Sequence, residues 1–346
     1  MREGLSFDDV LIVPNHHSMV ESRQDPDVSV AFDENKTLVE PVIASPMDTV
    51  ASPELLAGLS SLGTFGIMHR YCSKADQLET LKRAEKLLVA GEELYAGVAL
   101  GTHEDLDDDD LLAVCEMASV LCVDVANGDS IGSVDTVRNV RRLFPEKHIM
   151  AGNVATSGGV VRLGDAGADS VRIGIGSGAA CSTRTMTGIG VPQLTAIMWC
   201  REAADDWGVK LIADGGIRNP GDLCKALAAG ADLVMLGSIF AGSHESPSEL
   251  TEDEYGNPVK YYRGMASKAA QDTRGGLRVI VPEGVEGTVP YRGTVQDILT
   301  QFVGGLRSSM TYVNAQNLDR YWMNTEFMKV TQAGLTESNP HDLGSL

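Results

Sequence analysis

Eight short apolar runs, each followed by a stretch with helical spacing, predict an α/β protein that folds as a closed (β/α)8 barrel, or TIM barrel. Continuous apolar runs are typical of strands buried on both faces, and their alternation with helices implies parallel strands. The 346 residues are enough for one large barrel, so we expect a single domain over residues 1–346. The alternative is an open doubly wound sheet, which is less favoured because no Gly-rich dinucleotide fingerprint follows the first strand.

The barrel strands are predicted where apolar runs stop at Gly, Asp or Asn. In chain order these strands are 41–45, 64–68, 94–99, 119–125, 147–151, 169–174, 209–213 and 232–236. The helices are predicted from apolar residues that recur on one face, as Leu55, Leu56 and Leu59 do in the first helix. In order these helices are 53–62, 74–90, 107–118, 131–143, 157–166, 192–206 and 219–229, with 295–308 after the last strand.

Two long segments interrupt the alternation of strands and helices. Residues 174–191 form a Gly-, Ser- and Thr-rich loop after the sixth strand, and residues 240–294 separate the eighth strand from its helix. The second segment contains a region, 264–294, that we interpret as a flap. Long loops at the carboxyl ends of barrel strands are where this architecture places its chemistry, so we expect the active site there.

Charge and composition exclude several classes of function. The chain has 48 acidic and 28 basic residues, a formal net charge of −20 that repels nucleic acid and anionic membranes. No apolar stretch reaches the ~18 residues of a membrane span, and the first ten residues have no signal-peptide core. The six cysteines have no CxxC spacing, which indicates reduced, mostly buried thiols. We therefore expect a cytoplasmic protein that binds neither nucleic acid nor membrane.

Glycine turns end the seventh and eighth strands. Asp214 precedes Gly215 and Gly216, and Gly237 precedes Ser238. Barrels often hold a phosphate with backbone N–H groups of these two loops, and glycine allows the backbone to approach the anion closely. The pattern favours a phosphate site, although the same residues could form ordinary barrel turns.

One cysteine, Cys181, lies in the Gly-rich loop and not in an apolar run. It stands beside Ser182, Thr183 and Arg184, and nearby positive charge would favour a thiolate. From the pattern alone, a catalytic nucleophile and an incidental thiol are equally supported.

Several motifs, taken together and in order, are similar to those of the IMP dehydrogenase / GMP reductase family. They are SFDDVLIVP at 6–14, ASPMDTV at 44–50, MAGNV at 150–154, GIGSGAACSTR at 174–184, IADGGI at 212–217, VMLGS at 234–238, YRGMAS at 262–267 and GLRSSMTYV at 305–313. Any one of them would be a weak signal, but several in sequence over nearly the whole chain make chance agreement improbable. The family fold is a (β/α)8 barrel, in agreement with the predicted strands.

Within this family the chain most resembles GMP reductase. That resemblance implies NADPH-dependent deamination of GMP to IMP and ammonia through a covalent cysteine–purine adduct. It rests on DVANG at 124–128, on STRTMTGIGVPQL at 182–194, on a short flap with Gly275–Gly276 and no Arg-Tyr pair, and on the absence of a CBS regulatory insertion. The alternative is an IMP dehydrogenase without CBS domains, which converts IMP to XMP with NAD. YRGMAS, VPEGVEGTVPYRG, AGLTESNPHD and Arg70 favour this alternative.

The resemblance also implies roles for particular residues. Cys181 would attack purine C2, and Thr183 and Glu283 would relay protons. The implied substrate-binding residues are Ser45, Met47, Asp214, Gly215, Gly216, Gly237, Ser238, Gly264, Met265 and Ser267. The implied cofactor-binding residues are Asp124, Asn127, Gly128 and Arg70, and Arg70 could instead be a surface arginine. Carbonyls of Gly176, Gly178 and Cys181 resemble the family's potassium ligands, and the family's homotetramer is implied as well.

Two readings outside this enzyme class remain open. One is a phosphate-binding barrel without redox chemistry, such as an isomerase or a nucleotide sensor. The other is a structural protein that keeps only the barrel. Cys181, Thr183 and Glu283 together argue against a sensor, which would need none of them.

Overall fold

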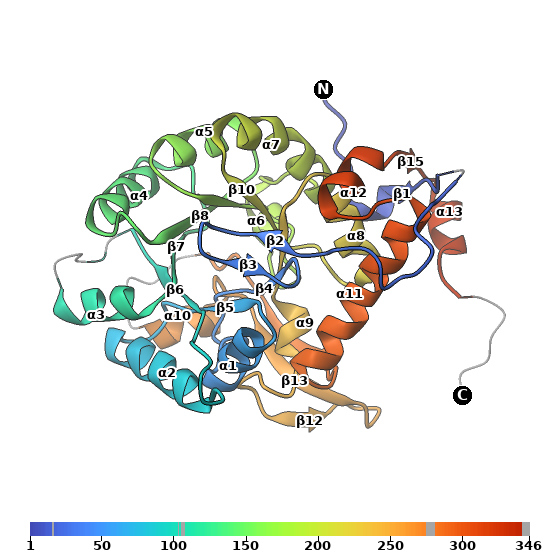
Figure 1. Ribbon diagram of the computed structural model, residues 1–346. Helices are drawn as coiled ribbons and strands as arrows, with labels where there is room; N and C mark the ends of the chain where they lie inside the picture. Colours follow the sequence, from blue (N-terminus) through green and yellow to red (C-terminus); the bar gives the residue numbers. More distant parts are fainter. Residues whose placement is uncertain (16, 103, 105–107, 275–280, 341–346) are drawn as a thin grey trace.

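Eight parallel strands close into a barrel in the computed structural model, which describes residues 1–15, 17–102, 104, 108–274 and 281–340. Around the barrel the strands follow the order β10-β11-β4-β5-β6-β7-β8-β9 (Figure 1). Their bounds are β4 Val42–Ala44, β5 Phe65–Met68, β6 Gly97–Leu100, β7 Val120–Asp124, β8 His148–Val154, β9 Ser170–Ile173, β10 Lys210–Asp214 and β11 Leu233–Leu236. Each predicted strand overlaps one of these, so the predicted (β/α)8 fold is confirmed.

Helices surround the barrel and cover the outer faces of the strands (Figure 1). They are α1 Pro53–Ser61, α2 Lys74–Leu87, α3 Asp109–Met117, α4 Ile131–Leu143, α5 Ser157–Asp165, α7 Gln193–Trp207, α8 Pro220–Ala228 and α11 Val295–Tyr312. Several begin where a side chain accepts a free backbone N–H, as Ser52 does from Leu55 and Asn219 does from Asp222. Residues 88–96 alone connect α2 to β6, so no further domain is inserted at that point.

A short hairpin covers the amino-terminal end of the barrel. It consists of β2 (Val30–Ala31) and β3 (Thr37–Leu38), which lie in front of the barrel in Figure 1. Phe32, which follows β2, stacks on the His148 ring with the ring centroids 4.0 Å apart and also contacts Phe65. These side chains belong to the core inside the barrel, so this end is filled by packing.

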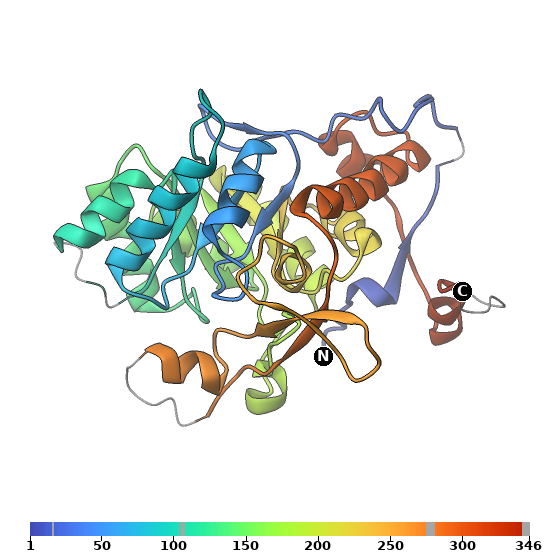
Figure 2. The same cartoon turned by 90° about the horizontal axis from the view of Figure 1, so that it is seen from below.

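The opposite end of the barrel carries the long loops, and Figure 2 shows the two ends on opposite sides. A three-stranded antiparallel sheet lies there, made of β12 (Leu250–Glu252), β13 (Pro258–Arg263) and β14 (Glu286–Pro290). Three short helices accompany it: α6 (Thr183–Thr187), α9 (Ser238–Ala241) and α10 (Lys268–Arg274). The segment that was expected to interrupt the barrel therefore forms a structured cover over its carboxyl end.

Several elements were not predicted from the sequence. The 3-10 helix η1 (Phe7–Asp9) leads into β1 (Val10–Ile12), which pairs with β15 (Phe327–Lys329) near the other end of the chain. The helices α12 (Leu318–Asn324) and α13 (Gln332–Glu337) complete the fold. Strands of two or three residues are too short to show a period, and their partners lie far away in the sequence. Among the described residues, no helix combines the length and the apolar character that a membrane crossing requires.

Candidate active site

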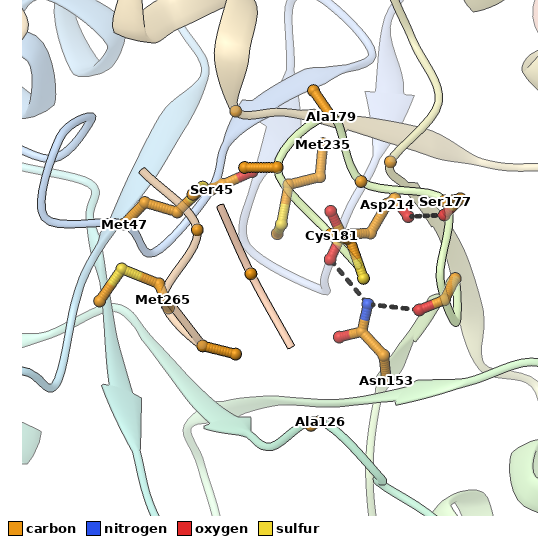
Figure 3. Close-up of a pocket in the computed structure, with 18 of the residues that line it drawn as sticks. Ser45, Met47, Ala126, Asn153, Ser177, Ala179, Cys181, Asp214, Met235 and Met265 are labelled. Carbon is orange, nitrogen blue, oxygen red and sulfur yellow. Dashed lines mark hydrogen bonds between the residues drawn. The ribbon is translucent and has the colours of Figure 1, made fainter. Parts of the chain in front are cut away.

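A cavity of about 370 Å³ opens at the carboxyl end of the barrel, under the loops that follow the strands. Most of the predicted site residues line it, although they are scattered over 240 positions of the sequence. They are Ser45, Met47, Arg70, Asp124, Gly176, Gly178, Cys181, Thr183, Asp214, Gly215, Gly216, Gly237, Ser238, Gly264, Met265 and Glu283. Figure 3 shows Cys181, Asp214 and Asn153 among the side chains that line this cavity.

Cys181 begins a hydrogen-bonded chain that ends on a carboxylate. Its thiol donates to the Thr183 hydroxyl at 3.2 Å, and that hydroxyl donates to Glu283 Oε2 at 2.8 Å. The side chain of Cys181 is exposed, whereas Cys115, Cys122, Cys200 and Cys224 are buried and Cys72 is partly buried. Cys181 is therefore placed as a reactive thiol with a route for its proton, as a nucleophile requires.

Arg184 does not supply the positive charge that was expected beside the thiol. Its guanidinium donates to the Val191 carbonyl at 2.7 Å and packs against Gly176 and Gly190. Arg184 therefore closes the Gly-rich loop on itself, and the partner of Cys181 is the Thr183 hydroxyl.

Backbone hydrogen bonds join three loops over the cysteine. Val285 N donates to Ala180 O at 3.0 Å, and Gly264 N donates to Val285 O at the same distance. Ser182 N donates to Glu283 O at 2.9 Å. These bonds fix Glu283, which lies within the flap, against the loop that carries the nucleophile.

The close approach of these loops requires glycine at 284. A Cβ built on Gly284 would lie 2.8 Å from Ser267 N and 3.1 Å from the carbonyl carbon of Ala266, which is closer than real Cβ contacts. Close packing between the backbones therefore requires glycine next to Glu283.

Asp214 ends β10, and one of its carboxylate oxygens accepts hydrogen bonds from three donor atoms. Its Oδ2 accepts from Asn153 Nδ2 at 2.8 Å, and from Arg172 at 2.7 Å through Nη2 and 3.2 Å through Nε. Among the described residues Oδ1 has no such partner, and Asp214 lines the cavity, so this carboxylate can accept further hydrogen bonds from a ligand. Figure 3 shows the Asn153 contact.

The other side of the cavity holds Asp124 and Arg70. Arg172 Nη1 donates to Asp124 Oδ1 at 2.5 Å, and Arg70 Nε donates to the Asp124 carbonyl at 3.0 Å. The Arg70 side chain is only 10% exposed, so it is not a surface arginine. Its guanidinium also lies over the Tyr71 ring, at 5.2 Å from the centroid.

The glycine turns form a cradle at one end of the cavity. Gly215 has φ +98°, and a Cβ there would lie 2.6 Å from Ser177 Oγ, so only glycine fits without strain. At Gly237, the Cβ position lies 3.2 Å from Tyr262 Oη and 3.3 Å from Ser45 Oγ. The hydroxyls of Tyr262 and Ser45 therefore lie beside the glycine turn at 237, which is a suitable environment for a phosphate.

Three predicted residues lie outside the cavity lining. Asn127 is exposed, and its side chain accepts from Asp129 N at 3.3 Å. Gly128 N donates to the Asn153 carbonyl, and Ser267 Oγ accepts from Ala270 N at the start of α10. In this structure these residues make contacts within and between loops, and their predicted ligand-binding roles stay predictions.

The sequence analysis missed Arg172, Asn153 and Tyr262. Arg172 and Asn153 stand in or next to apolar runs, where a charged or amide side chain is an informative exception. Tyr262 belongs to the quoted YRGMAS motif, and burial raises the pKa of its phenol, with Asp214 and Cys181 adding to the effect. It therefore stays protonated as a hydrogen-bond donor.

Comparisons with known proteins identify what this site resembles. A family model described as IMP dehydrogenase / GMP reductase domain matches residues 4–341. The inosine-5′-monophosphate dehydrogenase of Nitrosopumilus maritimus is 32% identical over 99% of this chain and 99% of that protein. The enzyme of the same name from Cryptosporidium parvum is 34% identical over 99% of this chain and 96% of that protein.

Other relatives are more similar over a shorter stretch. The inosine-5′-monophosphate dehydrogenase of Aquifex aeolicus is 45% identical over 72% of this chain, and the match spans about half (52%) of that protein's length. Five further relatives, from 33% to 46% identical, carry the same description. The alignment with the Nitrosopumilus protein runs over 472 positions, so that protein has segments with no counterpart in these 346 residues.

The prediction of GMP reductase is therefore wrong, and the alternative of an IMP dehydrogenase fits the relatives better. NADPH, which followed from the reductase prediction, is wrong for the same reason. The misleading signals came from loops, which vary most between relatives. In DVANG, Asn127 and Gly128 make contacts within and between loops, and the Gly275–Gly276 pair lies outside the described residues.

Proposed function

The chain belongs to the IMP dehydrogenase / GMP reductase family of oxidoreductases that act on purine nucleotides, and from this premise we propose that it oxidises IMP to XMP with NAD. The observation that carries the proposal is the chain of hydrogen bonds from Cys181 through Thr183 to Glu283. The relatives described as inosine-5′-monophosphate dehydrogenases support the choice of reaction.

In the first half of the reaction, Cys181 attacks C2 of the purine. The thiol proton passes through the Thr183 hydroxyl to the Glu283 carboxylate as the C–S bond forms. When bound, NAD accepts the hydride that leaves C2. The products of this half are NADH, a purine joined to Cys181, and one proton, which Glu283 releases to solvent.

In the second half, water attacks C2 of the bound purine and displaces the cysteine sulfur. The Thr183 hydroxyl and Glu283 accept a proton from the water, and that proton returns to the departing sulfur. The sum of the two halves is IMP, NAD and water giving XMP, NADH and one proton. Since the chain has no Arg-Tyr pair in its flap, the Thr183–Glu283 pair is the base that the described site offers for this step.

The rest of the cavity fits a purine nucleotide. Asp214 would accept hydrogen bonds from the ribose hydroxyls, and Gly215, Gly216, Gly237 and Ser238 would hold the 5′-phosphate with Tyr262. In addition, Ser45 and Met47 would line the ribose pocket, while Gly264 and Met265 would contact the base edge.

The nicotinamide half of NAD fits the side of the cavity formed by Asp124 and Arg70. A carboxylate is the group that binds ribose hydroxyls of NAD, and Asp124 is 17% exposed toward this space. Arg70 donates to the Asp124 carbonyl and so would hold Asp124 in position on this side of the cavity. Its guanidinium would also offer a positive charge to the cofactor's phosphates.

A potassium ion would lie among carbonyls of Gly176, Gly178 and Cys181. Gly178 O accepts the Cys181 N–H at 3.1 Å, so these residues form a tight turn in the loop. The ion would hold the loop that carries the nucleophile. Replacing K⁺ by Li⁺ at constant ionic strength should reduce turnover if the carbonyls bind it.

We also propose that the chain assembles as a homotetramer. Large apolar side chains are exposed together on α7 and α12, where the Arg201 guanidinium lies 5.9 Å from the ring centroid of Trp322. Trp322 is 42% exposed and Met323 66%, as expected for a surface that a second copy covers. Size-exclusion chromatography with light scattering would measure the assembly.

The test of the proposed function is the appearance of NADH absorbance when the protein is mixed with IMP and NAD. XMP should form in equal amount, measured by chromatography. GMP with NADPH is the matched control and should give no NADPH consumption. Absence of NADH with IMP and NAD, at any K⁺ concentration, would contradict the proposal and favour a phosphate-binding barrel without redox chemistry.

A further inference from the structure

Arg172 lies at the centre of the site and binds two carboxylates with one guanidinium. It stands on β9, and its side chain is 7% exposed. Its Nη1 donates to Asp124 Oδ1 at 2.5 Å, and its Nη2 donates to Asp214 Oδ2 at 2.7 Å. These carboxylates end β7 and β10, and they face the two halves of the cavity that the proposed function gives to NAD and to IMP.

The guanidinium remains charged in this position. Burial by itself would lower the pKa of Arg172, but the carboxylates of Asp214 and Asp124 outweigh this effect and raise the pKa well above its ordinary value. The planar fork of arginine supplies several donors in fixed directions, so one side chain can hold both carboxylates. A lysine ammonium has the same charge but no such fork.

Each carboxylate has one oxygen on the guanidinium and a second oxygen that is free of it. Asp214 Oδ2 accepts hydrogen bonds from Arg172 and Asn153, while Asp124 Oδ1 accepts one from Arg172. A ligand that binds the second oxygen of one carboxylate therefore fixes the guanidinium, and through it the other carboxylate. Ordering of this kind is a physical route by which one ligand tightens the binding of another.

Resting on the proposed function, we propose that Arg172 is a positioning residue that couples the binding of the two nucleotides through Asp214 and Asp124. It acts through the two carboxylates and takes no part in the bond changes at C2. Its removal leaves the two carboxylates without their shared cation, and each keeps only a separate partner, Asn153 for Asp214 and Arg70 for Asp124.

The coupling is measured in a protein that binds both nucleotides but does not turn over, which Cys181→Ala should provide. Calorimetry gives the Kd of NAD with and without saturating IMP. We expect IMP to tighten NAD binding about tenfold, within the usual range of such couplings. Adding Arg172→Met should bring this ratio close to one, and adding Arg172→Lys should also remove most of it because lysine cannot hold both carboxylates.

A matched control separates coupling from loss of stability. Arg141→Met removes another arginine, which pairs with Asp169 and donates to the Gly167 carbonyl away from the cavity, and it should keep the ratio of the parent. In the active protein, Arg172→Lys should raise the KM of both nucleotides more than it lowers kcat. If Arg172→Met does not fold, Arg172→Lys carries the test.

A ratio that stays about tenfold in the folded Arg172 variants, or that is already one in the parent, would overturn the proposal. Both results are compatible with NADH formation by the unsubstituted protein. Failure of the proposed function is seen separately, as the absence of NADH from IMP and NAD in that protein.

Discussion

The Thr183 hydroxyl donates a 2.8 Å hydrogen bond to Glu283 Oε2, and this bond joins the Gly-rich loop to the flap. The two residues are 100 positions apart in the sequence. Since Thr183 also accepts from Cys181, one hydroxyl connects the nucleophile with the base.

Replacing Glu283 by Gln should slow the attack of water more than the transfer of hydride, because the amide accepts no proton and water needs a base far more than a thiol, whose ordinary pKa is about 8.5. We expect steady-state turnover to fall about 100-fold, within the usual range for loss of a general base. Rapid mixing should show a burst of NADH followed by a slow phase. Equal slowing of the burst and the slow phase would count against this role.

Replacing Cys181 by Ala should abolish NADH formation and leave IMP binding nearly unchanged, because the thiol forms a bond to the substrate but adds little to its binding. Turnover and calorimetric titration with IMP are the two measurements. Cys72→Ala is the control, since Cys72 is partly buried and burial raises the pKa of its thiol to about 11. Residual turnover near that of the unsubstituted protein would contradict the role of Cys181 as the nucleophile.

Replacing Gly284 by Ala should lower kcat strongly, because the new methyl group would lie 2.8 Å from Ser267 N and push Glu283 away from Thr183. A misplacement of about 1 Å can cost roughly 100-fold in rate. Gly287→Ala is the matched control, because no atom lies within 4 Å of the Cβ position there. Similar kcat values for the two variants would show that the close approach does not position the base.

Stability should decrease as the pH falls from 6.5 toward 4, because of His148. Burial lowers the pKa of this imidazole from 6.5 to about 4, so in that range the unfolded chain binds a proton that the folded protein does not. The contribution is fully present above pH 6.5, and the loss amounts to about 3 kcal/mol at most. Urea unfolding of His148→Gln should show a smaller loss over this range, and equal slopes for the two proteins would contradict the prediction.

Salt should stabilise the fold, because a net charge of −20 repels itself and salt screens that repulsion. Screening also weakens exposed ion pairs such as Arg138–Asp135, but such pairs contribute only about 0–1 kcal/mol each. The Tm should therefore rise between low salt and about 1 M KCl. A constant or falling Tm over this range would mean that the surface charges are already balanced locally.

The sequence by itself determined the barrel and most of the candidate site. Strand and helix periods are encoded in neighbouring residues, and the carboxyl ends of parallel strands meet at one end of the barrel. Asp214 and Gly237 could therefore be assigned to one cavity from their places after the strands, and the family resemblance added Ser45. The same logic singled out Cys181 as the cysteine outside an apolar run.

Only the tertiary structure decided which of these groups touch one another. The bond between Thr183 and Glu283, the two carboxylates on Arg172, and the Phe32–His148 stack each join segments whose approach depends on how the whole barrel closes. Neither the sequence motifs nor the tertiary structure separated GMP reductase from IMP dehydrogenase, because the motifs used for that choice lay mostly in variable loops. The comparison with relatives corrected the choice. Local patterns specify elements, whereas contacts between distant loops follow from packing that no short segment encodes.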